Sequence, residues 1–211
     1  VDEGEIYRHL ELDWVPPELR EDTGEIAAAN DDLLPRLIVP SDVKGALHNH
    51  TTLSDGDATL EEMADAARNI GWNWLGVADH SPSLKVANGA SAEDLLDQGK
   101  KIKQYNAAWA NEGVDFRLFH GVESDILEGG KLDHPDNVLA ELDYVVASVH
   151  AMTKWKNRDE VTNTEELIRC IDHPATNVLG HPTGRILQGR DGYEVDMFAI
   201  IDHMAEHNEA G

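Results

Sequence analysis

Short apolar runs alternate with longer amphipathic segments from residue 44 onward. Five runs predict strands, because each is brief, apolar and bounded by polar residues or glycine. They cover residues 45–47, 74–78, 117–122, 144–149 and 178–180. Helices are expected after Thr59, whose capping box with Glu62 marks a helix start, after Ser91, and over residues 165–171 and 195–205. This alternation predicts an α/β fold with a mainly parallel sheet or barrel.

Residues 1–43 differ from the rest of the chain. They carry four prolines and many carboxylates and show no sustained apolar periodicity. Proline is incompatible with helix interiors, and Pro16 and Pro17 predict an extended segment that enters a short turn. We interpret residues 1–43 as a lead-in, for which a disordered tail is the alternative, and residues 44–211 as the domain.

Composition and charge limit the protein class. With 41% hydrophobic and 27% charged residues, the chain is a folded protein and not a disordered or collagenous one. The net charge of −24 makes the chain as a whole a poor nucleic-acid clamp, so a phosphate substrate would need local positive charge. No apolar run is long enough for a membrane span and the N-terminus lacks signal-peptide features, so we expect a cytoplasmic protein with no membrane partner. The single cysteine, Cys170, is expected to be a packing residue.

Metal-ligand residue types follow the predicted strands one after another. In a parallel barrel the carboxyl ends of the strands share one face, so these side chains would meet there. The candidates are His48, His50, Asp55, His80, Glu123, His150 and His181. Taken singly, His48 and His50 could be surface residues, Asp55 a turn former and His80 a core histidine, but the joint pattern favours metal ligation.

Imidazoles and carboxylates without a thiolate suit Zn, Mn or Fe. The set exceeds the needs of one ion, so we expect two or three divalent ions bridged by Glu123, able to activate water and neutralise phosphate oxygens. Arg185 is the better candidate for a phosphate contact, and Lys85 the weaker one.

Other histidines are set aside. His203 and His207 have zincin spacing, but Met204 replaces the expected catalytic glutamate. We expect four more to be solvated or to make ordinary polar contacts: His9, His120, His134 and His173.

The motifs LHNHTTLSDG (47–56), VADHSPSLKVANG (77–89), GVESDIL (121–127), ELDYVVASVH (141–150) and LGHPTGR (179–185) resemble the PHP family, the polymerase and histidinol phosphatase domains. The resemblance is closest to the C-terminal PHP domain of bacterial-type family X DNA polymerases, and LDWVPPELRE (12–21) is similar to the stretch that joins it to the polymerase portion.

The resemblance implies a distorted (β/α)7 barrel with a trinuclear metal centre that hydrolyses phosphoesters. His48, His50 and Glu123 would hold one ion, Glu123, His150 and His181 a second, and Asp55 with His80 a third. The catalytic residues would be His48, His50, Glu123 and Arg185. The substrate would be DNA 3′ ends, processed by a 3′ to 5′ exonuclease that works with a polymerase domain in the parent chain.

Two departures from the family pattern change the expectation. The last metal motif of the family, Asp-x-His, has no counterpart, and the polymerase portion is absent upstream. We therefore expect a fragment: a lead-in at 1–43 that links to the absent polymerase portion, and an incomplete PHP domain at 44–211, truncated at its C-terminal end. Two alternatives remain: a phosphatase acting on small phosphomonoesters such as histidinol phosphate, and a metal-stabilised structural domain without activity.

Overall fold

A computed structural model describes residues 2–186 and 188–209. The chain divides into two compact units, residues 1–43 and 44–211. Unit 1 contains the helices α1 (Glu3–His9) and α2 (Glu25–Asn30) and the 3-10 turns η1 (Pro17–Leu19) and η2 (Pro40–Asp42). The short turn expected after Pro16 is therefore confirmed, whereas the two helices were not predicted. A local cap explains the first of them, because the Asp2 side chain accepts the backbone N–H of Glu5 and begins α1.

Unit 2 has the alternating order that the sequence predicts. Its strands are β1 (Trp74–His80), β2 (Arg117–Asp125), β3 (Tyr144–Ser148) and β4 (Val178–Leu179). Its longer helices are α3 (Leu60–Asn69), α4 (Ala92–Glu112), α7 (Glu160–Ile171) and α8 (Met197–Glu209), and its shorter ones are η3 (Lys85–Ala87), α5 (Asp136–Leu139) and α6 (Met152–Lys156). The capping box of Thr59 and Glu62 is confirmed at the start of α3.

The strands form one parallel sheet in the order β1-β2-β3-β4. The predicted first strand is not a full strand, but residues 44–49 run beside β1: the carbonyls of Lys44, Ala46 and Asn49 accept hydrogen bonds from Trp74, Gly76 and Ala78. The α/β class and the parallel sheet are thus confirmed. The described residues form an open sheet, which corresponds to part of the expected barrel.

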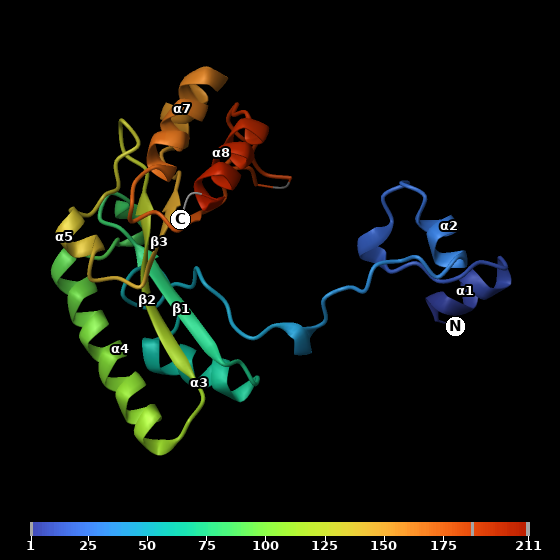
Figure 1. The fold of residues 1–211 in the computed structure, drawn as a ribbon, viewed down its shortest axis with the longest axis horizontal. Helices are drawn as coiled ribbons and strands as arrows, with labels where there is room; N and C mark the ends of the chain where they lie inside the picture. The colour runs from blue at the N-terminus through green and yellow to red at the C-terminus, as the bar shows by residue number, and fades with distance from the viewer. Residues whose placement is uncertain (1, 187, 210–211) are drawn as a thin grey trace. The chain divides into compact units, whose positions relative to one another are not determined.

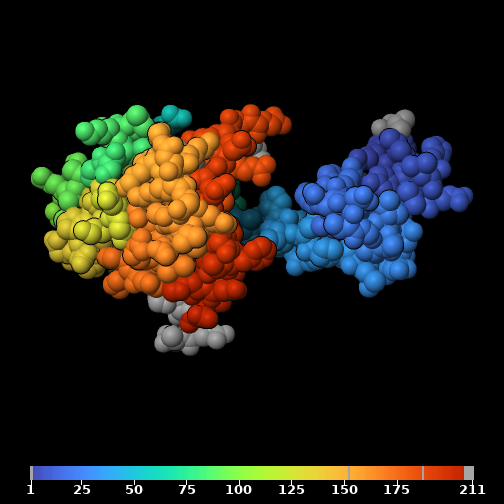
Figure 2. All heavy atoms as spheres, turned by 90° about the horizontal axis from the view of Figure 1, so that it is seen from above, coloured from blue at the N-terminus to red at the C-terminus, as the bar shows by residue number. Residues whose placement is uncertain are grey.

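Two large apolar cores pack against one face of the sheet, and a smaller cluster around Tyr144 and Val146 lies on the other. One lies between α3, α4 and the outer faces of β1 and β2, around Leu75, Ile102 and Leu118. The other joins β2 and β3 to α7 and α8, around Val145, Leu167 and Ile200. Figure 1 shows α4 alongside the strands, and Figure 2 shows α7 (orange) and α8 (red) next to each other on the surface. Cys170 is fully buried in the second core, as expected, and burial raises the pKa of its thiol to about 11.

Candidate metal centre

The carboxylate of Glu123 lies at the centre of the histidine cluster and is 1% exposed. Five imidazoles surround it. On Oε1, the contacts are His48 Nε2 at 2.9 Å, His181 Nε2 at 2.9 Å and His150 Nε2 at 3.3 Å. On Oε2, they are His80 Nδ1 at 2.8 Å and His50 Nε2 at 3.6 Å. The structure therefore brings together residues that are up to 133 positions apart in the sequence, from His48 to His181.

The parallel sheet explains this convergence. His80 is the last residue of β1 and pairs in register with Glu123 on β2. His150 follows the end of β3 by two residues, and His181 follows the end of β4 by two. Because parallel strands end at the same edge, all of these side chains reach one place.

Asp55 reaches the cluster from a turn after the first extended segment. Its Oδ2 lies 3.5 Å from His80 Nε2, and its Oδ1 lies 3.9 Å from His50 Nδ1. The turn is closed by backbone hydrogen bonds from Ser54 and Gly56 to the carbonyl of Thr51. A side chain at Gly56 would meet the carbonyl oxygen of His50 at 2.3 Å, so the turn requires glycine at this position.

The donor set fits divalent metal ions. Three groups of ligand atoms each lie within 4.8 Å of one another: His48, His50 and Glu123; His50, Asp55 and His80; and His80, Glu123 and His150. His50 Nδ1 is buried without a hydrogen-bond partner among the described atoms, whereas His80 Nδ1 and Glu123 Oε2, which are also buried, face each other at 2.8 Å. Buried polar atoms of this kind are costly unless something satisfies them, and imidazole and carboxylate are ligands that Zn, Mn and Fe accept.

The pKa shifts of Glu123 and His50 favour the protonation states that bind cations. Burial alone would raise the pKa of the Glu123 carboxyl, but hydrogen bonds from His150 and His181 help to hold it far below its usual range. Burial lowers the pKa of His50, and the neighbouring His80 adds to this effect. Glu123 therefore stays anionic and His50 stays neutral near pH 7, which are the forms that bind metal.

Asp125 contacts His150 on the side of the ring that faces away from Glu123. The sequence analysis did not select this residue. Its Oδ1 lies 3.0 Å from His150 Nδ1, while His150 Nε2 faces Glu123. Burial alone would lower the pKa of His150, but hydrogen bonds to Asp125 and Glu123 raise it to about 9. The position two residues after Glu123 on the same strand was the available signal, because alternate residues share one face.

Asp79 fixes the turn that carries Asp55. Its Oδ1 accepts hydrogen bonds from the Thr51 N–H at 2.7 Å and the Ser54 hydroxyl at 2.7 Å. Its Oδ2 accepts from the Thr51 hydroxyl at 2.8 Å and from Gln98 Nε2 at 2.7 Å. This fully buried carboxylate thereby ties the turn to β1 and α4.

Arg185 and Lys85 remain predictions as phosphate contacts. Both side chains are exposed, and neither makes an ion pair or a side-chain hydrogen bond with the cluster in the described part of the chain. The loop of Arg185 is held by Arg190, whose guanidinium donates to the carbonyl of Gly184, and by the Tyr193 hydroxyl, which donates to Pro182.

The histidines outside the cluster differ from expectation at two positions. His120 and His134 are each only 4% exposed, so neither is solvated. Both ring nitrogens of His120 are buried without a hydrogen-bond partner among the described residues, because the ring packs against Gly99 of α4. His203 lies 2.7 Å from Asp172 and outside the metal groups, and the side chain of His207 lies outside the described residues.

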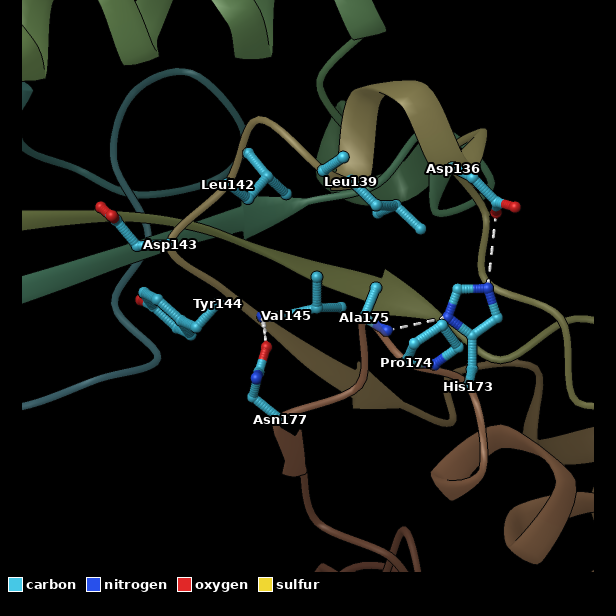
Figure 3. Close-up of a pocket in the computed structure, with 11 residues that line it drawn as sticks. Asp136, Leu139, Leu142, Asp143, Tyr144, Val145, His173, Pro174, Ala175 and Asn177 are labelled. Carbon is cyan, nitrogen blue, oxygen red and sulfur yellow. Dashed lines mark hydrogen bonds and ion pairs between the residues drawn. The ribbon is translucent and has the colours of Figure 1, made fainter. Parts of the chain in front are cut away.

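A separate pocket of about 390 Å³ lies at the amino ends of β3 and β4 (Figure 3). Its walls include Tyr144, Asn177 and His173, whose Nε2 lies 3.4 Å from Asp136. None of its lining residues belongs to the histidine cluster. The chemistry of the cluster, and not the size of this pocket, therefore identifies the candidate site.

Comparison with known proteins identifies the family. A profile of the PHP domain matches residues 46–209. The chain belongs to the PHP domain family. It is 40% identical over 208 residues, 99% of this chain and 35% of the relative, to "DNA polymerase/3'-5' exonuclease PolX" of Bacillus subtilis (strain 168). It is also 31% identical to two proteins named "Probable phosphatase", from Caldicellulosiruptor saccharolyticus (77% of this chain, 62% of the relative) and Clostridium acetobutylicum (77% and 60%).

This chain thus spans about a third of the length of the Bacillus relative and about three fifths of the length of the other two. Membership of the family and the names of these relatives support a hydrolase of the phosphoester class. Among the described residues, no helix combines the length and the apolar character that crossing a membrane requires.

Proposed function

We propose that the chain is the metal-dependent phosphoesterase part of a family X DNA polymerase, and that it removes nucleotides from DNA 3′ ends as a cytoplasmic 3′ to 5′ exonuclease. The observation that carries the proposal is the convergence of five imidazoles on the buried carboxylate of Glu123. The match to the polymerase and exonuclease of Bacillus subtilis over nearly the whole chain supports the choice of DNA. Residues 1–43 would then link the domain to a polymerase portion, which would be its partner.

The proposed ligands follow the family pattern. His48, His50 and Glu123 would hold one divalent ion, Glu123, His150 and His181 a second, and Asp55 with His80 a third. When bound, such ions supply an activated water and neutralise the oxygens of the phosphoester.

The side chains of the protein have the remaining tasks. The anionic carboxylate of Glu123 would serve as a ligand at two of the ion positions. Asp125 keeps the proton of His150 on Nδ1, so that Nε2 faces the cluster. Arg185, on the loop that follows His181, would contact the phosphate through its guanidinium fork.

A small-molecule phosphatase is the second candidate. The relatives named as phosphatases and the net charge of −24 favour it, since a small phosphomonoester needs no long basic surface. The two candidates share the metal centre and differ in what lies around it.

One experiment separates them. Metal content would be measured by elemental analysis beside hydrolysis of a 5′-labelled oligonucleotide and of histidinol phosphate, in the wild type, His150→Ala and the control His173→Ala. His173 also pairs with a carboxylate, Asp136, but outside the cluster. Metal-dependent shortening of the oligonucleotide that only His150→Ala abolishes is the expected result. Activity on histidinol phosphate alone would support the phosphatase, and bound metal without activity on either substrate would support a structural domain.

A further inference from the structure

Charge is distributed unevenly over unit 2. The segments that follow the strands at the carboxyl edge are residues 51–59, 81–91, 126–135, 149–159 and 180–196. Together they hold seven lysines and arginines against eight carboxylates, whereas the remainder of residues 44–211 holds seven against 21. These segments are therefore together close to neutral, although the chain as a whole is strongly acidic.

Four lysines in three of these segments are exposed, and we call them the basic rim: Lys85, Lys131, Lys154 and Lys156. Lys85 lies on the segment that begins directly after His80, and Lys154 and Lys156 lie on α6, directly after His150. Among the described residues, Lys154 is the one member with an ion pair, at 3.4 Å from Glu128. Glu128 is 86% exposed, so this pair holds the lysine only weakly.

Direct contacts join the three segments in the order of the strands. The N–H and hydroxyl of Ser83 donate to Asp133 at 2.6 and 2.7 Å, which ties the segment of Lys85 to that of Lys131. The pair of Lys154 with Glu128 ties the segment of Lys131 to α6. The segments that carry the rim are thus neighbours along the edge that carries the cluster.

Buried anchors fix the two ends of the row. In α6, Trp155 lies between the two exposed lysines, is 1% exposed, and accepts a hydrogen bond at its carbonyl from Asn163. The segment of Lys85 is closed at its base by the N–H of Ala90, which donates to the carbonyl of His80 at 2.7 Å. The backbone that carries these lysines is therefore held by hydrogen bonds close to two of the cluster histidines, His80 and His150.

From this arrangement we infer that the basic rim binds the phosphates of a polynucleotide strand whose scissile phosphate lies at the histidine cluster. The inference rests on the proposed function and specifies its substrate class. A small phosphomonoester carries one phosphate, which the cluster would take, and would leave the rim without a partner. A polynucleotide supplies further phosphates beside the first, and the acidic remainder of the unit repels it from other faces.

The chemistry predicts binding without sequence preference. Lysine ammonium groups are point charges that contact phosphates and do not read bases. Each contact releases counterions, so the logarithm of the affinity falls with the logarithm of salt concentration by about 0.7 per neutralised phosphate of a single strand.

The test compares two variants that lose the same charge. The rim variant K85Q/K131Q/K156Q removes the three rim lysines without an ion pair, and the control K100Q/K101Q/K103Q removes three exposed lysines of α4. Binding of a fluorescein-labelled single strand of about 12 nucleotides would be followed by anisotropy from about 50 to 200 mM NaCl, the range over which phosphate contacts weaken steeply. The rim variant is expected to lower the salt slope by about 2 and the affinity at low salt at least tenfold, and the control to change the affinity less than about twofold.

A third variant tests whether removal of a negative charge beside the rim strengthens binding of the oligonucleotide. Glu128→Gln removes the carboxylate that faces Lys154 and is expected to tighten binding about two- to threefold, since one more lysine becomes available. Equal weakening by both triple variants, or no weakening by the rim variant, would overturn the inference.

Hydrolysis assays separate failure of the rim from failure of the proposed function. The same oligonucleotide and bis(p-nitrophenyl) phosphate, which has a single phosphate, would be given to the wild type and both triple variants. The rim variant should raise KM for the oligonucleotide and lower the preference for it over the small diester at least about tenfold. Rim-dependent binding without hydrolysis of either substrate would refute the proposed function and leave the rim supported. Hydrolysis of both with an unchanged preference would refute the rim alone.

Discussion

The Nδ1 atom of His150 lies 3.0 Å from Oδ1 of Asp125, on the side of the ring opposite to Glu123. A carboxylate in this position accepts a hydrogen bond from Nδ1–H, so that Nε2, once deprotonated, offers its lone pair toward the cluster. Such carboxylate–histidine pairs orient metal ligands and raise their basicity. The pair therefore links a residue that no motif reasoning selected to the chemistry of the site.

Asp125→Asn should weaken metal binding by about 10- to 100-fold, because the amide lacks the charge that favours the Nδ1–H tautomer. Metal retained during titration with a chelator measures the effect. Asp136→Asn is the matched control, since Asp136 also faces a histidine, His173, outside the cluster. Equal metal retention in both variants would show that Asp125 does not support His150.

Asp79→Asn should cost about 2 to 3 kcal/mol of stability, because an amide nitrogen in place of either oxygen faces hydrogen-bond donors. Each oxygen of Asp79 accepts two hydrogen bonds, among them those from Thr51 and Ser54 in the turn before Asp55. Urea denaturation measures the loss, with the exposed Asp65→Asn as the control. A change of less than about 0.5 kcal/mol, the usual range of surface substitutions, would argue against this role for Asp79.

Four of the five expected strands and the convergence of the histidines were predictable from the sequence because both depend on short-range patterns, whereas residues 45–47 form no strand. An apolar run followed by His80 or His150 places the ligand at a strand end without knowledge of the rest of the chain. Asp79 and Asp125 could not be assigned in this way, because the role of a carboxylate depends on which donors the fold brings to it. Asp79 meets Gln98, which lies 19 residues away on α4, and Asp125 meets His150, which follows the end of β3.

The buried histidines show the same limit of prediction from sequence, because their environment depends on residues that are distant in the chain. His120 lies on β2 in a segment whose residues are mostly apolar, yet its polarity favoured an exposed position. Its burial depends on Gly99, which leaves room for the ring beneath α4. A glycine inside a helix pattern signals close packing, but the sequence does not name the partner.

Gly99→Ala tests this packing. In an open helix position alanine would stabilise by about 0.5 to 1 kcal/mol. Here the new Cβ would lie 2.6 Å from both Cε1 and Nδ1 of His120, so we expect a loss of about 1 to 3 kcal/mol. The loss should shrink in the His120→Ala background, where the ring is absent. Thermal unfolding of the single and double variants gives the coupling, and additive effects would contradict a contact between the two residues.

The burial of His120 also predicts how stability depends on pH. Burial lowers the pKa of its imidazole to about 4, and the charge of Asp143 only partly opposes this. In the unfolded chain a histidine has a pKa of about 6.5, so between these values the unfolded state binds the extra proton. Stability is therefore complete above about pH 6.5 and is lost as the pH falls toward 4, by about 3 kcal/mol if the whole shift is realised.

Other groups titrate in the same range, so the measurement is a difference between proteins. The free energy of unfolding would be determined from pH 4 to 7 in the wild type, His120→Leu and the exposed control His9→Asn. The profile of His120→Leu should be flatter than that of the wild type by up to about 3 kcal/mol, because leucine does not titrate and fills the apolar site beside Gly99. The profile of His9→Asn should follow that of the wild type, since His9 is exposed and belongs to unit 1. Parallel profiles for all three proteins would show that His120 is protonated as easily in the folded chain as in the unfolded one, and its burial would then not control acid stability.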